Sequence, residues 1–71
     1  MDTRTLQDIV RRQPFRPFTF RMIDGREFQV THPEWIAVTR RSVTVIDPET
    51  EEVTYLEPVL IASLEFSVSQ G

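Results

Sequence analysis

The sequence predicts a mainly β fold in which one N-terminal helix precedes five or six short antiparallel strands. Three observations predict it: an apolar stripe at helical spacing near the start, alternating apolar and polar residues in the segments that follow, and turn-forming residues between those segments. Strands this short, with tight connections, tend to curl into a small barrel. We expect a single domain, with the helix over about residues 3–13, the barrel over about 17–66 and a fraying polar tail over 67–71.

The N-terminal helix is predicted from its capping residues and its spacing. Candidates for the capping residue are Asp2, Thr3 and Thr5. Apolar residues then fall at i, i+3 and i+4, at Leu6, Ile9 and Val10. The helix ends before Pro14, because the residue preceding a proline avoids the α region. A helix this short is not stable alone, so its apolar stripe must pack against the strands.

The segment "PFRPFTFRMIDGREFQVT" predicts the first hairpin. Its alternation places Phe18, Phe20 and Met22 on one face. Asp24-Gly25 is a strong hairpin signal, and we expect positive φ at both positions. We interpret Pro-Phe-Arg-Pro-Phe as structural: Phe15 and Phe18 enter the core, and Pro17 begins an edge strand.

The remaining elements are predicted in the same way, from strand-forming segments and the turn or proline residues between them. "HPEW" ends the second strand and allows one helical turn, "IAV" is extended, and Thr39–Ser42 forms a turn. "SVTVID" and "EVTYLE" are strands joined by a turn at residues 48–51, and "IASLEF" is the last strand after a break at Pro58. The residues expected to form the core are Leu6, Ile9, Phe18, Phe20, Phe28, Val30, Ile36, Val45 and Leu64.

Two resemblances bear on this fold. The order of helix, Asp-Gly hairpin, strand pair, short turn and terminal strand resembles an Sm-like or SH3-like small barrel, as in the bacterial host-factor RNA chaperone. The segments that carry the likeness are "FTFRMIDGREFQV" and "VLIASLEF". Separately, the pattern "PFRPF…DGREF…HPEW" strongly resembles a set of short bacterial proteins whose function is unknown. The first resemblance implies RNA binding, although the stretches that correspond to the Sm uridine-binding loops lack asparagine at 32–38 and are acidic at 56–59.

Composition argues against several functions. The net charge of -3 disfavours general nucleic-acid binding, and neither a signal peptide nor a membrane span is predicted. The chain has no cysteine and one histidine, which excludes disulfides and disfavours a zinc site of the usual kind. No nucleophile or acid is fixed near His32, and the acidic residues at 49–52 look like a solvated hairpin tip. We therefore expect a cytoplasmic protein that is not an enzyme and uses no cofactor.

The expected function is a non-enzymatic interaction or assembly module that self-associates, with binding to another protein as a further option. Residues 1–41 carry all eight arginines and five acidic residues, whereas residues 42–71 carry six acidic residues and no basic one, so unlike halves of two copies attract. Open strand edges are the expected contacts, namely the segment around Val43–Asp47 and the final strand Ile61–Phe66. The alternative is an Sm-like RNA-binding protein, and the candidate contacts for a partner or RNA are Trp35, Arg40 and Arg41.

Overall fold

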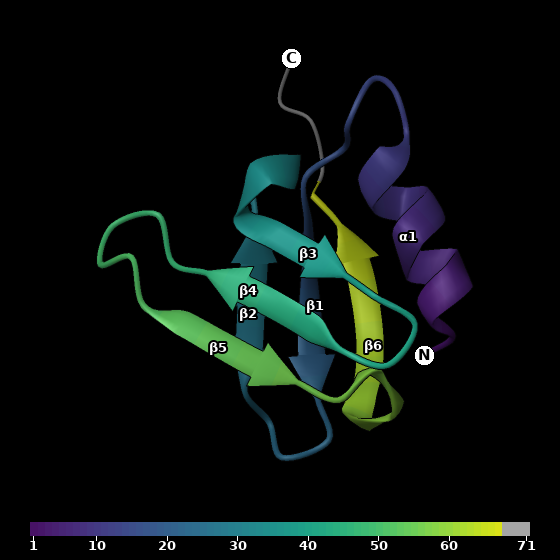
Figure 1. The fold of residues 1–71 in the computed structure, drawn as a ribbon, viewed down its shortest axis with the longest axis vertical. Coiled ribbons are helices and arrows are strands. Elements are labelled where there is room, and N and C mark those ends of the chain that lie inside the picture. Colours follow the sequence, from purple (N-terminus) through teal and green to yellow (C-terminus); the bar gives the residue numbers. More distant parts are fainter. Residues whose placement is uncertain (68–71) are drawn as a thin grey trace.

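The computed structural model describes residues 1–67 and contains one α-helix and six strands in two antiparallel sheets (Figure 1). Helix α1 spans Thr3–Arg11. Sheet A has the strand order β2-β1-β6 and consists of β1 (Phe18–Met22), β2 (Glu27–Val30) and β6 (Ile61–Phe66). Sheet B has the order β3-β4-β5 and consists of β3 (Ile36–Val38), β4 (Val43–Ile46) and β5 (Val53–Leu56). The expected mainly β fold with an N-terminal helix is therefore confirmed.

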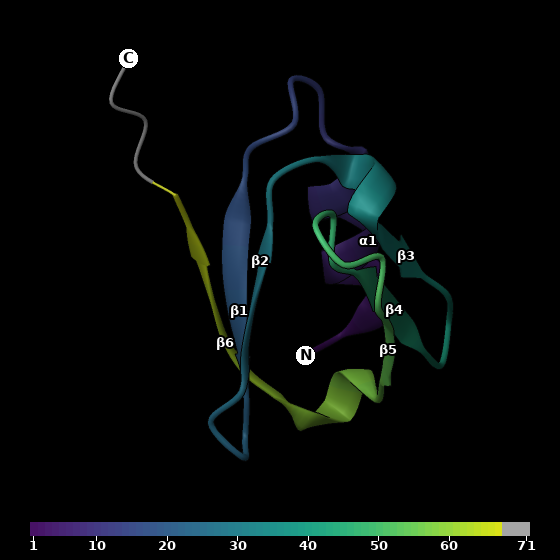
Figure 2. The ribbon, with the colours of Figure 1, turned by 90° about the vertical axis from the view of Figure 1, so that its left-hand side faces the viewer.

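The two sheets face each other as layers, with sheet A on the left and sheet B on the right of Figure 2. Single 3₁₀ turns carry the chain between them, at Pro33–Trp35 from β2 to β3 and at Pro58–Leu60 from β5 to β6. Among residues 1–67, strand pairing joins strands only within each sheet, so no hydrogen-bonded barrel closes. The predicted tail lies, apart from Ser67, outside the described residues.

Helix α1 is capped as the sequence suggests and covers one edge of sheet B. The Asp2 side chain accepts a hydrogen bond from the Arg4 backbone N–H at 3.0 Å, which satisfies a free donor of the first turn. The helix ends at Arg11, two residues earlier than expected. Leu6 is completely buried, and the Gln7 side chain donates to the Val38 carbonyl at 3.2 Å. Because this carbonyl lies on β3, the helix shields an edge that would otherwise be open.

The hydrophobic core lies between the sheets and is close to the predicted one. Of the nine predicted core residues, six are buried: Leu6, Phe18, Phe20, Val30, Ile36 and Val45. The other three are half-buried at its margin: Ile9, Phe28 and Leu64. The prediction omitted four buried apolar residues: Met22, Val43, Leu56 and Ile61. Phe15 is half-buried and packs against the core with its ring centroid 6.0 Å from that of Phe18.

The first hairpin turn differs from the prediction. Only Gly25 has a positive φ, at 94°, whereas Asp24 does not. The Gly25 N–H donates to the Met22 carbonyl at 2.9 Å, and the Met22 N–H donates to the Arg26 carbonyl at 2.8 Å. This is a three-residue loop with glycine at its last position, which needs one positive φ instead of two. The Asp24 carboxylate accepts the Arg26 backbone N–H at 3.1 Å, and this bond lowers the pKa of Asp24.

Two expectations about strand edges are wrong. Pro17 does not begin an edge strand, because β1 lies between β2 and β6. The Pro17 carbonyl instead accepts a hydrogen bond from the Ser67 N–H at 2.9 Å. The segment Val43–Asp47 is not an edge either, because its strand β4 pairs with β3 on one side and β5 on the other. The final strand Ile61–Phe66 is an edge of sheet A, as expected.

Candidate functional site

The three predicted contact residues lie on sheet B but do not form one site. Trp35 is half-buried in the 3₁₀ turn before β3, whereas Arg40 and Arg41 are exposed in the turn after it. Arg40 follows Trp35 by five steps along a nearly extended chain, which corresponds to about 16 Å at about 3.3 Å per residue. A ligand that spans this distance could contact both ends, but a single nucleotide could not.

The turn that carries Arg40 and Arg41 is held by its flanking polar residues. The Thr39 N–H donates to the Ser42 carbonyl at 2.9 Å, and the Thr39 hydroxyl accepts the Ser42 N–H at 3.1 Å. The Thr3 hydroxyl at the start of α1 donates to the Arg40 carbonyl at 3.3 Å. These hydrogen bonds hold the backbone of the turn and do not use the arginine side chains, which are exposed.

Arg40 lies between two surface hollows. One, of about 420 Å³, is lined by Arg40, Arg41, Met1, Glu57, Pro58 and Val59, together with Thr3. The other, of about 510 Å³, is lined by Arg40, Arg4, Asp2, Thr3 and Gln7. Three arginines therefore surround this corner, although Glu57 and Asp2 reduce its positive charge. Guanidinium groups in such a corner suit phosphate or carboxylate oxygens.

A second candidate surface, which sequence reasoning missed, is the free side of β5. The Asp47 N–H donates to the Glu52 carbonyl at 2.9 Å, at the turn end of the β4–β5 ladder. Because antiparallel pairs alternate, Thr54 and Leu56 direct their backbone groups toward β4, whereas Val53 and Tyr55 direct theirs outward. The side chains of these two residues are also exposed, Tyr55 at 77% and Val53 at 46%.

The alternation of "EVTYLE" indicates part of this arrangement, namely which residues share a face of the strand. Val53 and Tyr55 share one face, and Thr54 and Leu56 share the other. With apolar residues on both faces, the pattern alone does not say which face lies inside. It also does not say that β5 is an edge.

In sheet A, the free side of β6 is an open strand edge like that of β5 in sheet B. The Ser67 N–H bonds to Pro17 and β6 pairs with β1, so the backbone groups of Leu64 and Phe66 face away from β1. The Arg16 guanidinium lies over the Phe66 ring, 4.4 Å from its centroid. The end of β6 therefore has a positive charge over the half-buried Phe66 ring, next to the exposed Glu65.

Within residues 1–67, no group of three or more histidine, cysteine or acidic side chains is arranged to hold a metal ion. No helix in that range is long and apolar enough to cross a membrane. Comparison with protein-family models, with curated proteins and with solved structures gives no match.

Proposed function

We propose that this chain is a non-enzymatic SH3/Sm-like module that self-associates by pairing the free edge of β5 with the free edge of β6 from a second copy. The observation that carries the proposal is that β5 combines backbone groups left unpaired within residues 1–67 with two exposed apolar side chains, Val53 and Tyr55. Natural proteins normally protect such an edge, because it can pair with another strand.

The SH3/Sm-like assignment is supported by how the chain passes between the sheets. A single 3₁₀ turn connects β2 to β3 and another connects β5 to β6, so consecutive strands wrap around one core. Small barrels achieve the same wrapping with bent strands and short turns. Strand β5 is an edge of sheet B and β6 is an edge of sheet A, which leaves one side of each strand for a neighbour.

Charge favours pairing of unlike edges over pairing of β5 with itself. Strand β5 has acidic residues at both ends, Glu51 and Glu52 before it and Glu57 after it. Two antiparallel copies of β5 would bring these like charges together. An antiparallel β5–β6 pair instead places Glu52 near the end of β6, where Arg16 lies over Phe66. A contact between unlike surfaces repeats from copy to copy and gives a ring when it closes, or a filament when it does not.

Light scattering from micromolar to about a hundredfold higher concentration tests this proposal, with Tyr55→Pro as the main variant. Proline removes the outward N–H of residue 55 but no bond to β4, so the fold should survive while pairing is lost. Tyr55→Thr is the matched control, because it keeps the N–H and should retain part of the assembly. A wild-type chain that stays monomeric throughout would contradict the proposal, as would a folded Tyr55→Pro chain that assembles like the wild type.

Mixing experiments separate unlike pairing from like pairing. Leu64→Pro blocks β6 and leaves β5 intact, so Leu64→Pro and Tyr55→Pro should each be monomeric and form a one-to-one dimer when mixed. Circular dichroism checks that each variant is folded. If Leu64→Pro does not fold, an excess of Tyr55→Pro added to the wild type should still shorten its assemblies, because it offers β6 but cannot continue the chain. Wild-type assemblies of unchanged size would then contradict β5–β6 pairing.

Binding of RNA is the second candidate function, and the observation that favours it is the group Arg4, Arg40 and Arg41 around the two hollows. A short labelled uridine oligonucleotide should bind at low salt, and its affinity should fall steeply as salt rises. Replacing Arg40 and Arg41 with glutamine should weaken binding, whereas replacing Arg11 and Arg12 should change it little. Equal losses in both double variants would indicate general attraction to arginine and contradict this candidate.

A further inference from the structure

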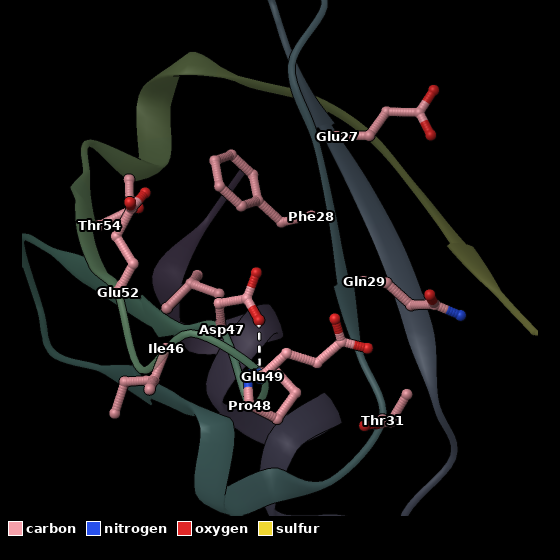
Figure 3. Close-up of a pocket in the computed structure, with 11 residues that line it drawn as sticks. Glu27, Phe28, Gln29, Thr31, Ile46, Asp47, Pro48, Glu49, Glu52 and Thr54 are labelled. Carbon is pink, nitrogen blue, oxygen red and sulfur yellow. Dashed lines mark hydrogen bonds between the residues drawn. The ribbon is translucent and has the colours of Figure 1, made fainter.

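A groove of about 410 Å³ separates β2 from the β4–β5 hairpin, on a different side of the molecule from the arginine corner. One wall consists of Glu27 and Gln29 of β2 and of Thr31, which directly follows the strand; the other consists of Asp47, Glu49 and Glu52 of the hairpin. Figure 3 shows the Phe28 ring reaching into the space between these two walls. The groove therefore has an aromatic floor, and its carboxylates lie on the hairpin wall, because the Glu27 side chain points away from Phe28.

The wall formed by β2 is an open strand edge. The Met22–Arg26 backbone bond fixes the alternation of the β1–β2 ladder, so Phe28 and Val30 direct their backbone groups toward β1. The backbone groups of Glu27, Gln29 and Thr31 consequently point away from β1. In the part of the chain that the structure describes, β2 has no second strand partner. An extended peptide can add to such an edge as an extra strand, with hydrogen bonds between main chains.

The side chains around this edge specify the charge of the added strand. Glu27 already forms an ion pair with Arg21, and the Asp47 carboxylate accepts the Glu49 N–H at 2.8 Å within the turn. Glu49 and Glu52 form no ion pair within residues 1–67, and both are exposed. Two uncompensated carboxylates opposite an open strand edge favour a partner with positive side chains.

The aromatic floor of the groove is held by its neighbours within the chain. The Phe28 ring stacks on Phe20 with centroids 5.3 Å apart, which fixes its orientation. The Arg26 guanidinium lies over the same ring, 5.8 Å from its centroid, so the chain itself supplies a cation to this floor. An arginine from a partner is therefore expected to bind the hairpin carboxylates with its planar fork.

We propose that β2 binds an extended, arginine- or lysine-containing peptide segment of another protein as an added strand. Its main chain pairs with the outward backbone groups of Glu27, Gln29 and Thr31, and its basic side chains meet Glu49 and Glu52 across the groove. This inference does not depend on self-association, because it uses β2 and leaves the edges of β5 and β6 free.

Fluorescence anisotropy tests the charge requirement. The probe is a labelled eight-residue peptide that alternates arginine with threonine, and the control peptide replaces each arginine with glutamate. The arginine peptide should bind with saturation at low salt, and the glutamate peptide should not. The double variant Glu49→Gln with Glu52→Gln should weaken binding about three- to tenfold, as expected for two exposed ion pairs. The matched variant Glu34→Gln with Glu57→Gln removes the same net charge outside the groove and should change binding little.

Amide hydrogen exchange tests the strand pairing. With the arginine peptide bound, exchange at Glu27, Gln29 and Thr31 should slow, while exchange at Val53 and Tyr55 should stay unchanged. A peptide that is N-methylated at every second residue cannot donate to the edge and should bind more weakly. The proposal is overturned if no saturable binding occurs, if both double variants lose affinity equally, or if the β2 amides gain no protection.

Discussion

At the scale of single residues, the core depends on a few large side chains in the middle of sheet A. Phe18 and Phe20 are both completely buried on β1, with ring centroids 6.4 Å apart. A chain of this length buries a smaller fraction of its unfolded surface than a larger domain does, so each large core residue carries a large share of the stability. The half-buried Phe28 extends the same aromatic cluster toward the groove.

Phe20→Ala should reduce the free energy of unfolding by about 3–5 kcal/mol, because it removes a fully buried ring and leaves a cavity. Urea unfolding followed by circular dichroism measures the change. Thr19→Ala, on the opposite face of the same strand, should change stability by less than about 0.5 kcal/mol. A Phe20→Ala chain as stable as the parent would mean that the assigned inner face of β1 is incorrect.

At the scale of elements, the turns decide how the strands meet. The β1–β2 turn uses Gly25 at a φ of 94°, and a Cβ added there would have no atom within 4 Å. The cost of a side chain at this position is therefore conformational and not steric crowding by neighbours. The β4–β5 turn places Glu51 in the left-handed region at a φ of 62°, a position that the sequence pattern did not indicate.

Gly25→Val should lower the free energy of unfolding by about 1–2 kcal/mol, because a β-branched residue resists positive φ. Gly25→Asn is the matched control and should cost less, since asparagine adopts this region more readily. Thermal or urea unfolding of both variants measures the difference. Equal stability of the valine, asparagine and glycine chains would show that the turn does not need a positive φ.

At the scale of the whole molecule, the two sheets present different outer surfaces. The outer face of sheet A is polar, with Thr19, Arg21, Glu27, Gln29, Ser63 and Glu65. The outer face of sheet B includes the exposed Val53 and Tyr55 beside a free strand edge. Helix α1 covers the β3 edge of sheet B and leaves the β5 edge open. This asymmetry is the reason that β5, and not another strand, is central to the proposed assembly.

If copies assemble through β5, the thermal midpoint of the wild-type chain should rise with protein concentration, because association stabilises the folded state by mass action. The midpoint of Tyr55→Pro should not depend on concentration. Scans from micromolar to about a hundredfold higher concentration measure this. A concentration-independent wild-type midpoint would argue against assembly by the folded chain and would leave the peptide proposal for β2 unaffected.

The sequence by itself determined the local structure of this protein. The spacing of Leu6 and its neighbours determined the helix, the alternation in "FTF" determined the inner face of β1, and the turn residues set the limits of the strands. These are short-range properties, because a side chain's position along a helix or strand follows from backbone geometry alone.

Only the tertiary structure decided which strands are neighbours. The run "SVTVID" looks like any half-buried strand, and alternation reports which face is buried but not which strand lies alongside. The alternation therefore could not show that Val43–Asp47 lies in the centre of sheet B. The edge of that sheet is β5. The groove beside β2 has the same origin: Phe28 and Glu49 are 21 positions apart in the sequence, and packing of the two sheets brings them together.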